Sequence, residues 1–178
     1  MNTKQAYIEL YREYHKDESK YPGNSFHPHA SKIAALIETY DAKTVLDYGC
    51  GKGRQYSQEK LHNLWGFMPA LYDPAVAAFN KLPTETFDGI YSTDVMEHIP
   101  LSVIPEVFDW IFNHATRFVY FNISTKPAIA VLPNGENAHC TVLTIDQWED
   151  LMLQYNTAQV PTYLNCSGLS RGYRKYFV

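Results

Sequence analysis

The chain has 178 residues, of which 46% are hydrophobic and 14 are tyrosines, and its formal net charge is −4. Length and composition indicate one folded domain, and the small negative charge provides no general attraction to nucleic acid or to an anionic membrane. The three cysteines are widely spaced, which favours reduced thiols, and we find neither an export signal nor a stretch that could span a bilayer. We therefore expect a cytoplasmic protein.

The first 40 residues predict two helices that precede the core. One helix is expected over residues 3–15, where apolar and aromatic side chains recur at helical spacing: Tyr7, Ile8, Leu10, Tyr11 and Tyr14. A polar connection with Pro and Gly leads to a second helix over 28–40. The first helix either packs on an edge of the sheet, the interpretation we favour, or forms a lid over a ligand together with Tyr21 and Asn24.

The remainder of the chain, residues 41–178, alternates between strand and helix patterns. Strands are expected at 43–48, before Asp73, at 87–92, at 117–124, and twice in the tail around a turn at 167–172. Helices are expected over 54–64, 103–115 and 144–155, the last of which begins with a capping box pattern. The alternation predicts a single-domain α/β sandwich with a mostly parallel sheet, and the tight final connection predicts an antiparallel edge strand.

The stretch VLDYGCGKGRQY places three glycines, Gly49, Gly51 and Gly53, directly after the first core strand. A phosphate-binding P-loop would require Ser or Thr after Lys52, and a dinucleotide fingerprint would require glycine in place of Arg54. Neither condition is met. The loop therefore predicts close approach of a ligand that is neither a nucleoside triphosphate nor a typical dinucleotide.

Two acidic residues narrow the choice of ligand. Asp47 stands two residues before the first glycine, where a carboxylate suits a ligand that carries a positive group better than it suits a pyrophosphate. Asp73 ends the next strand and can accept hydrogen bonds from both hydroxyls of a ribose. S-adenosylmethionine, which has an ammonium group, a sulfonium and a ribose, meets both requirements.

The motifs DYGCGKG, YDP and FDGIYSTDVMEHIP, in this order, resemble class I S-adenosylmethionine-dependent methyltransferases over about residues 41–155. The resemblance implies one Rossmann-like methyltransferase domain over 1–178, with residues 1–40 as a helical cap or lid, and S-adenosyl-L-methionine as the cofactor. It implies these cofactor contacts: Asp47, Gly49, Cys50, Gly51, Gly53, Tyr72, Asp73, Pro74, Asp94 and Val95. Only 13 residues separate Asp73 from Phe87, so the third strand of the family is expected to be reduced or missing. Candidates for the adenine pocket are then Leu82, Pro83 and Thr84.

Two histidines are candidates for catalysis. His98 in DVMEHIP is placed near the mouth of the cleft, either as a general base or as a residue that only supports the pocket. His139 lies in a long loop, 125–143, where it is either a substrate contact, with Asn134, Glu136 and Asn137 beside it, or an exposed loop residue. Methyl transfer can also proceed by proximity and orientation alone. The His and Cys spacings match no structural zinc pattern, so we expect no metal site.

The motifs favour a small molecule or a sugar hydroxyl as the methyl acceptor. The chain lacks the Asp/Asn-Pro-Pro-aromatic tetrapeptide and the Pro-Cys pair of enzymes that methylate bases, so nucleic acid is not favoured. One alternative is a module that binds S-adenosylmethionine or S-adenosylhomocysteine without catalysis, as a sensor or a partner subunit. A second alternative, an NAD-dependent oxidoreductase, is disfavoured by Arg54 and by the lack of a Tyr-x-x-x-Lys pair. None of these motifs bears on the oligomeric state.

Overall fold

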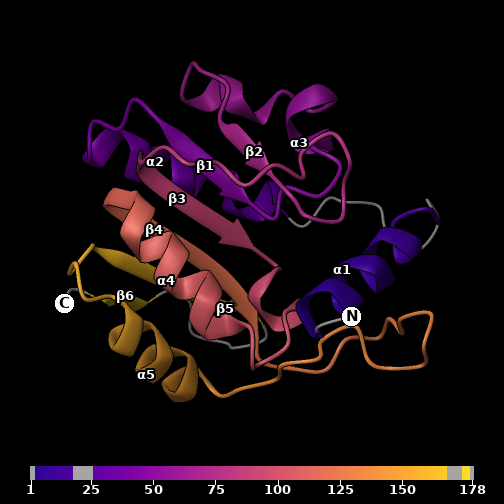
Figure 1. The fold of residues 1–178 in the computed structure, drawn as a ribbon. Coiled ribbons are helices and arrows are strands. Elements are labelled where there is room, and N and C mark those ends of the chain that lie inside the picture. Colours follow the sequence, from indigo (N-terminus) through magenta and orange to yellow (C-terminus); the bar gives the residue numbers. More distant parts are fainter. Residues whose placement is uncertain (1–2, 18–25, 168–173, 177–178) are drawn as a thin grey trace.

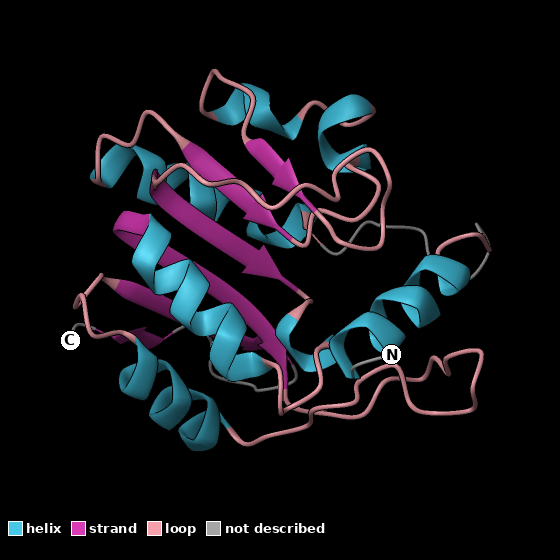
Figure 2. Cartoon of the chain, in the orientation of Figure 1, coloured by secondary structure: helices cyan, strands magenta, loops and turns pink. Residues whose placement is uncertain are grey.

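The computed structural model describes residues 3–17, 26–167 and 174–176 and consists of one sheet with helices on both faces (Figures 1 and 2). The sheet order is β2-β1-β3-β4-β5-β6. Its strands are β1 (Val45–Tyr48), β2 (Ala70–Tyr72), β3 (Phe87–Thr93), β4 (Ala115–Ser124), β5 (Thr162–Ser167) and β6 (Arg174–Tyr176). Strands β1 to β5 run parallel to one another, and β6 runs antiparallel to β5. The turn expected at 167–172 lies almost entirely outside the described residues.

Strand β4 shows why the sheet is covered on both faces. Its Phe118 and Tyr120 belong to the core under α2 (Ala30–Thr39), whereas Val119 and Phe121 belong to the core under α4 (Ile104–His114) and α5 (Ile145–Tyr155). All four side chains are fully buried. Because successive side chains of a strand point to opposite faces, an unbroken apolar run requires cover on both sides. The α/β sandwich predicted from the sequence is therefore confirmed.

The predicted helices differ in how well their ends were placed. Helix α1 (Thr3–Tyr14) and helix α4 agree with the sequence patterns, and the 3₁₀ turn η1 (His27–His29) leads into α2. The capping box of α5 is confirmed: the Gln147 amide donates to the Thr144 hydroxyl over 3.3 Å, and the Thr144 amide donates to the Gln147 side chain over 2.9 Å. The start of α5 was predictable because short-range hydrogen bonds set it.

The helix expected over 54–64 is wrong. Helix α3 spans only Arg54–Ser57, and a separate 3₁₀ turn, η2, spans Leu61–Leu64. Between them Lys60 adopts a left-handed conformation with φ of 56°, which a continuous right-handed helix cannot contain. The glycine loop is therefore followed by a single helical turn.

The connection between β2 and β3 contains turns and bends but neither helix nor strand. The expected loss of the third strand of the family is thus confirmed for residues 74–86. As a result β2, three residues long, forms one edge of the sheet. A very short strand limits the length of unpaired backbone at that edge.

Helix α1 stands apart from the sheet, across the carboxyl ends of its strands and beside the long loop 125–143 (Figure 1). None of its residues is buried. The packing on a sheet edge that we favoured is wrong, because Tyr7, Tyr11 and Tyr14 line a cavity instead. The other proposed lid residues, Tyr21 and Asn24, lie outside the described residues.

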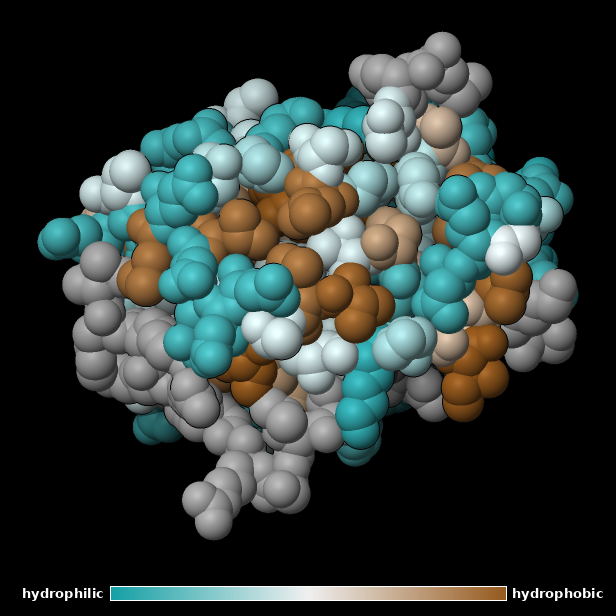
Figure 3. Space-filling view, turned by 90° about the horizontal axis from the view of Figure 1, so that it is seen from below, coloured by the Kyte–Doolittle hydropathy of each residue, from teal (hydrophilic) through white to brown (hydrophobic). Residues whose placement is uncertain are grey.

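The surface seen from below carries hydrophobic residues between hydrophilic ones (Figure 3). Among the described residues the large apolar side chains that are exposed include Ile129, Val131, Val142 and Leu153. In the described part of the chain no helix is both long enough and apolar enough to cross a bilayer.

Candidate active site

A cavity of about 460 Å³ lies at the carboxyl ends of β1, β2 and β3. Strand β1 pairs with β2 on one side and with β3 on the other, so the connections that follow β1 and β2 lead to opposite sides of β1 and the strand order reverses here. Such a switch point is where open parallel sheets bind their ligands. Helix α1 and the loop 125–143 contribute the opposite wall.

Gly49 allows the loop after β1 to approach the loop after β3. Its φ is 87°, and a Cβ at this position would lie 2.3 Å from Cγ2 of Val95. The amides of Gly49 and Cys50 both donate to the Tyr72 carbonyl oxygen, over 2.7 and 3.0 Å. A side chain at residue 49 would therefore both strain the backbone and clash with the cavity wall.

Asp73 is held at the cavity wall by backbone amides. Its Oδ2 accepts from the amide of Gly51 over 3.0 Å and its Oδ1 accepts from the amide of Ala75 over 2.9 Å. Burial raises the pKa of Asp73 above its ordinary value, and the hydrogen bonds from these amides oppose that rise. A carboxylate can accept about four hydrogen bonds, so this geometry leaves capacity for ribose hydroxyls.

Asp47 does not line the cavity. The side chain is 1% exposed, and its Oδ2 accepts from Gln55 over 3.0 Å and from the Tyr56 hydroxyl over 2.6 Å. Tyr56 also pairs with the hydroxyl of Tyr91 over 2.8 Å. We expected Asp47 to favour the ligand ammonium either directly or through water. A direct contact does not fit this geometry, because the carboxylate is turned into the protein, where it holds the first helical turn against β1.

Several other residues that were expected to contact the cofactor do not line the cavity. Cavity-lining residues include Tyr72, Asp73, Pro74, Asp94 and Val95 together with Gly49, but they do not include Cys50, Gly51 or Gly53. Those three shape the loop instead; Gly53, for example, has a φ of 63° beside the ring of Phe79. The adenine-pocket candidates Leu82, Pro83 and Thr84 do not line this cavity either.

The burial of Asp47 predicts a dependence of stability on pH. Burial raises its pKa from 3.8 to about 7, so between these values the folded state binds more protons than the unfolded state. The free energy of unfolding must then fall as the pH rises from about 4 to about 7. Three pKa units correspond to roughly 4 kcal/mol as an upper limit.

Asp47→Asn should remove this dependence, because the amide keeps the shape of the side chain without a charge. In urea unfolding, we expect the variant to match the wild type near about pH 4 and to exceed it by up to about 4 kcal/mol near about pH 8. Asp41→Asn is the matched control, since it removes a carboxylate that is exposed. Asn accepts the positive φ of 47° at residue 41 as readily as Asp does. Equal pH profiles for Asp47→Asn and the wild type would contradict this assignment.

Asp94 ends β3 in a left-handed conformation, with φ of 62°. Its amide donates to the Asn122 carbonyl oxygen over 2.9 Å, and the 3₁₀ turn η3 (Met96–His98) follows directly. A non-glycine residue in this conformation stores strain, which folds retain mainly at functional sites. The turn carries His98 back over the end of the strand that bears Asp94.

His98 is fixed by backbone and by helix α1. Its Nδ1 lies 2.9 Å from the Ala138 carbonyl oxygen and 2.9 Å from the hydroxyl of Tyr11, which itself donates to the same carbonyl. Burial lowers the pKa of His98 to about 4, so the ring is neutral near pH 7. A carbonyl can only accept, so in the neutral ring Nδ1 carries the proton and Nε2 carries the lone pair.

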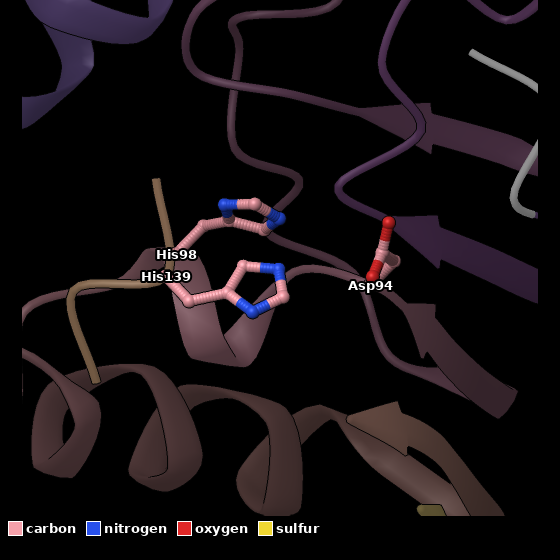
Figure 4. Close-up of side chains that lie close together, drawn as sticks. All are labelled: Asp94, His98 and His139. Atoms are coloured by element: carbon pink, nitrogen blue, oxygen red, sulfur yellow. The ribbon is translucent and has the colours of Figure 1, made fainter. Parts of the chain in front are cut away.

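His139 comes from the loop 125–143 and meets His98 over the cavity. The two ring centroids lie 4.8 Å apart with an interplanar angle of 82°. Figure 4 shows the rings beside each other, each with one nitrogen on the side that faces Asp94. Asp94, His98 and His139 each offer a ligand atom, and these atoms lie within 4.8 Å of one another. The sequence analysis placed His98 near the mouth of the cleft, left His139 as either a substrate contact or an exposed loop residue, and did not predict this trio.

The polar residues expected beside His139 organise the loop itself. Asn137 Oδ1 accepts from the amides of Ala128 and His139, and Asn134 Oδ1 accepts from the amide of Glu136. None of the three asparagine and glutamate side chains lines the cavity. Their role as direct substrate contacts therefore does not fit this geometry.

Helix α1 is tied across the cavity by polar contacts from its own side chains. The Tyr7 hydroxyl donates to Glu136 over 2.6 Å, and Lys4 pairs with Glu106 over 2.6 Å. Tyr11 reaches both His98 and the loop, as described above. The sequence analysis named a lid as the alternative for this helix but favoured packing on the sheet, because a helical stripe of aromatic residues is more often a buried face.

The sheet order, the cavity at the switch point and the acid at the end of β2 are features of Rossmann-like proteins, which bind nucleoside-bearing cofactors at this position. A family model described as a methyltransferase domain matches residues 23–160. No curated protein and no solved structure gives a significant match. The chain therefore belongs to the class I S-adenosylmethionine-dependent methyltransferase family, whose members take S-adenosylmethionine as the methyl donor.

Proposed function

We propose that the protein transfers a methyl group from S-adenosylmethionine to a hydroxyl of a small molecule. The observation that carries this proposal is a single cavity that joins Asp73, the ribose acceptor, to the pair His98 and His139. Membership of the methyltransferase family supports the choice of donor. This one cavity can hold the methyl donor and the acceptor side by side.

The orientation of the cofactor follows from the two ends of the cavity. With the ribose at Asp73, the methionine part lies along Gly49 and Val95, and the methyl group points toward the two histidines. The acceptor then lies under α1. Holding donor and acceptor in line supplies much of the rate enhancement in a transfer of this kind, because it replaces an encounter in solution.

The side chains around the acceptor end are mostly apolar or aromatic: Tyr7, Ile8, Tyr11, Tyr14, Val103, Val107 and Ile129. Such a lining favours an acceptor with an apolar or aromatic body over a polymer with a charged backbone. The net charge of −4 also argues against nucleic acid. We infer a small-molecule acceptor. Of the two classes expected from the sequence, this lining supports an apolar or aromatic small molecule better than a sugar.

The first test is calorimetric titration of the purified protein with S-adenosylhomocysteine, followed by incubation with methyl-labelled S-adenosylmethionine and the small-molecule fraction of a metabolite extract. We expect saturable binding and label in a small molecule, both reduced in Asp73→Ala. Binding without transfer to any fraction would favour the alternative, a sensor or partner subunit. Absence of binding would contradict both functions.

A further inference from the structure

We propose that Asp94, His98 and His139 form a binding site for a divalent transition-metal cation at the acceptor end of the cavity. The three residues come from the end of β3, from η3 and from the loop 125–143. All three line the cavity. The pattern was not predictable from sequence, because 40 residues separate the two histidines and only Asp94 and His98 are close in the chain.

The spacing of the donor atoms fits one cation after small adjustments. The ligand atoms of the trio lie within 4.8 Å of one another. Bonds of about 2.0–2.2 Å to a shared cation allow its donors to be at most about 4 Å apart. The widest pair must therefore close by roughly 1 Å, which rotation of the side chains can supply. Figure 4 shows both rings with a nitrogen on the side of the Asp94 carboxylate.

The hydrogen bonds behind the two rings are those of metal-binding histidines. Nδ1 of His98 donates to the Ala138 carbonyl oxygen over 2.9 Å, and Nδ1 of His139 donates to the Lys126 carbonyl oxygen over 2.5 Å. A carbonyl behind each ring fixes the tautomer with the lone pair at Nε2 and fixes the orientation of the ring. Both neighbouring histidines therefore have a free lone pair at Nε2. This arrangement favours one cation bound by the two Nε2 atoms.

A buried carboxyl group, that of Glu97, lies beside the trio. Glu97 is 0% exposed, and its Oε1 accepts from the Ser124 amide over 2.5 Å. Burial raises the pKa of Glu97 well above its ordinary value, and the neighbouring Asp94, to which its side chain is hydrogen-bonded, raises that pKa further. Glu97 is therefore protonated near neutral pH, and Asp94 is the carboxylate of the pair that can face a cation.

Two imidazoles and one carboxylate select borderline cations such as Zn²⁺, Mn²⁺, Fe²⁺ or Co²⁺ over Ca²⁺ and Mg²⁺, which prefer oxygen ligands. Three protein ligands leave coordination positions open for an oxygen of the acceptor. The site is therefore suited to bind and activate a hydroxyl rather than to stabilise the fold.

The role of the cation in catalysis rests on the proposed function, whereas its binding does not. An acceptor hydroxyl bound to the cation loses its proton to solvent near neutral pH, because the cation lowers the pKa of the hydroxyl. The resulting oxygen attacks the methyl carbon. The C–O bond forms as the S–C bond breaks, and the electron pair of that bond converts the sulfonium to a neutral thioether. The histidines then act as ligands rather than as bases.

The test is titration of the untagged full chain with cobalt(II) chloride, followed by calorimetry and by the visible absorption of the bound ion. We expect one saturable site, and binding weakened by at least about tenfold in Asp94→Ala, in His98→Ala and in His139→Gln. His139→Gln keeps a side chain of similar length without the imidazole, so it tests the ligand with little effect on folding. His27→Ala is the matched control, because that side chain is 69% exposed and lies outside the cavity.

Titration of the same samples with S-adenosylhomocysteine separates the two proposals. Cofactor binding without saturable cobalt binding would overturn the metal site and leave the methyltransferase proposal intact. Cobalt binding that is as tight in folded His139→Gln as in the wild type would also overturn it. Cobalt binding that depends on all three residues, without cofactor binding, would support the metal site and contradict the proposed function.

Discussion

Asp73→Ala should weaken the binding of S-adenosylhomocysteine by about 1–3 kcal/mol, which is roughly 5- to 150-fold. The substitution removes the carboxylate that we propose as the acceptor for two ribose hydroxyls. It also releases the Gly51 and Ala75 amides that now donate to Asp73. Calorimetric titration of wild type and variant measures the difference directly.

The control for this substitution must also remove a carboxylate that holds backbone amides. Asp88 provides it, because its Oδ2 accepts from the amides of Lys43 and Thr44 over 2.7 and 3.1 Å at the opposite end of β3. Asp88→Ala should reduce stability without changing the affinity for S-adenosylhomocysteine. An unchanged affinity in Asp73→Ala, or an equal loss in both variants, would contradict the placement of the ribose.

His98→Ala should lower the rate of methyl transfer by about 10²–10⁴-fold, the range typical for the loss of a group that handles a proton in the transition state. We expect this loss whether the ring takes the proton of the acceptor itself or holds the cation that acidifies the hydroxyl. Affinity for S-adenosylhomocysteine should change by less than about tenfold, because the ribose contact at Asp73 is unaffected. Rates are measured with the acceptor that the labelling screen identifies.

A supporting role for His98 would give a different pattern. The ring packs on Tyr11 with centroids 5.4 Å apart, so its removal also loosens α1. Tyr11→Phe keeps the packing and removes only the hydroxyl, and it should cost far less activity than His98→Ala. Equal losses of turnover and of cofactor affinity in His98→Ala would show that the residue only shapes the pocket.

The parts of the fold that short sequence patterns determine were predictable. The unbroken apolar and aromatic run of β4 predicts a strand that is buried on both faces, and the capping box at Thr144 marks the start of α5. The glycine loop and Asp73 could be placed at one edge because parallel strands end together. The family resemblance added the identity of the cofactor.

The parts that depend on long-range contacts were not predictable. The Asp47 carboxylate could face a ligand or the protein, and the positions of Gln55 and Tyr56 on α3 decide between them. His139 reaches His98 through a loop whose path is fixed by Asn137 and by backbone carbonyls rather than by a periodic pattern. The tyrosines of α1 have the spacing of a buried stripe, and their spacing does not show that this stripe faces a cavity.

Helix α1 has a consequence for the timing of the reaction. Its 12 residues help to enclose the cavity, and none of them is buried, so the helix is held largely by the polar contacts of Lys4, Tyr7 and Tyr11. In the proposed reaction we expect donor and product to exchange when these contacts break and the helix moves outward. The rate of that movement would then set an upper limit on turnover, however fast the chemical step is.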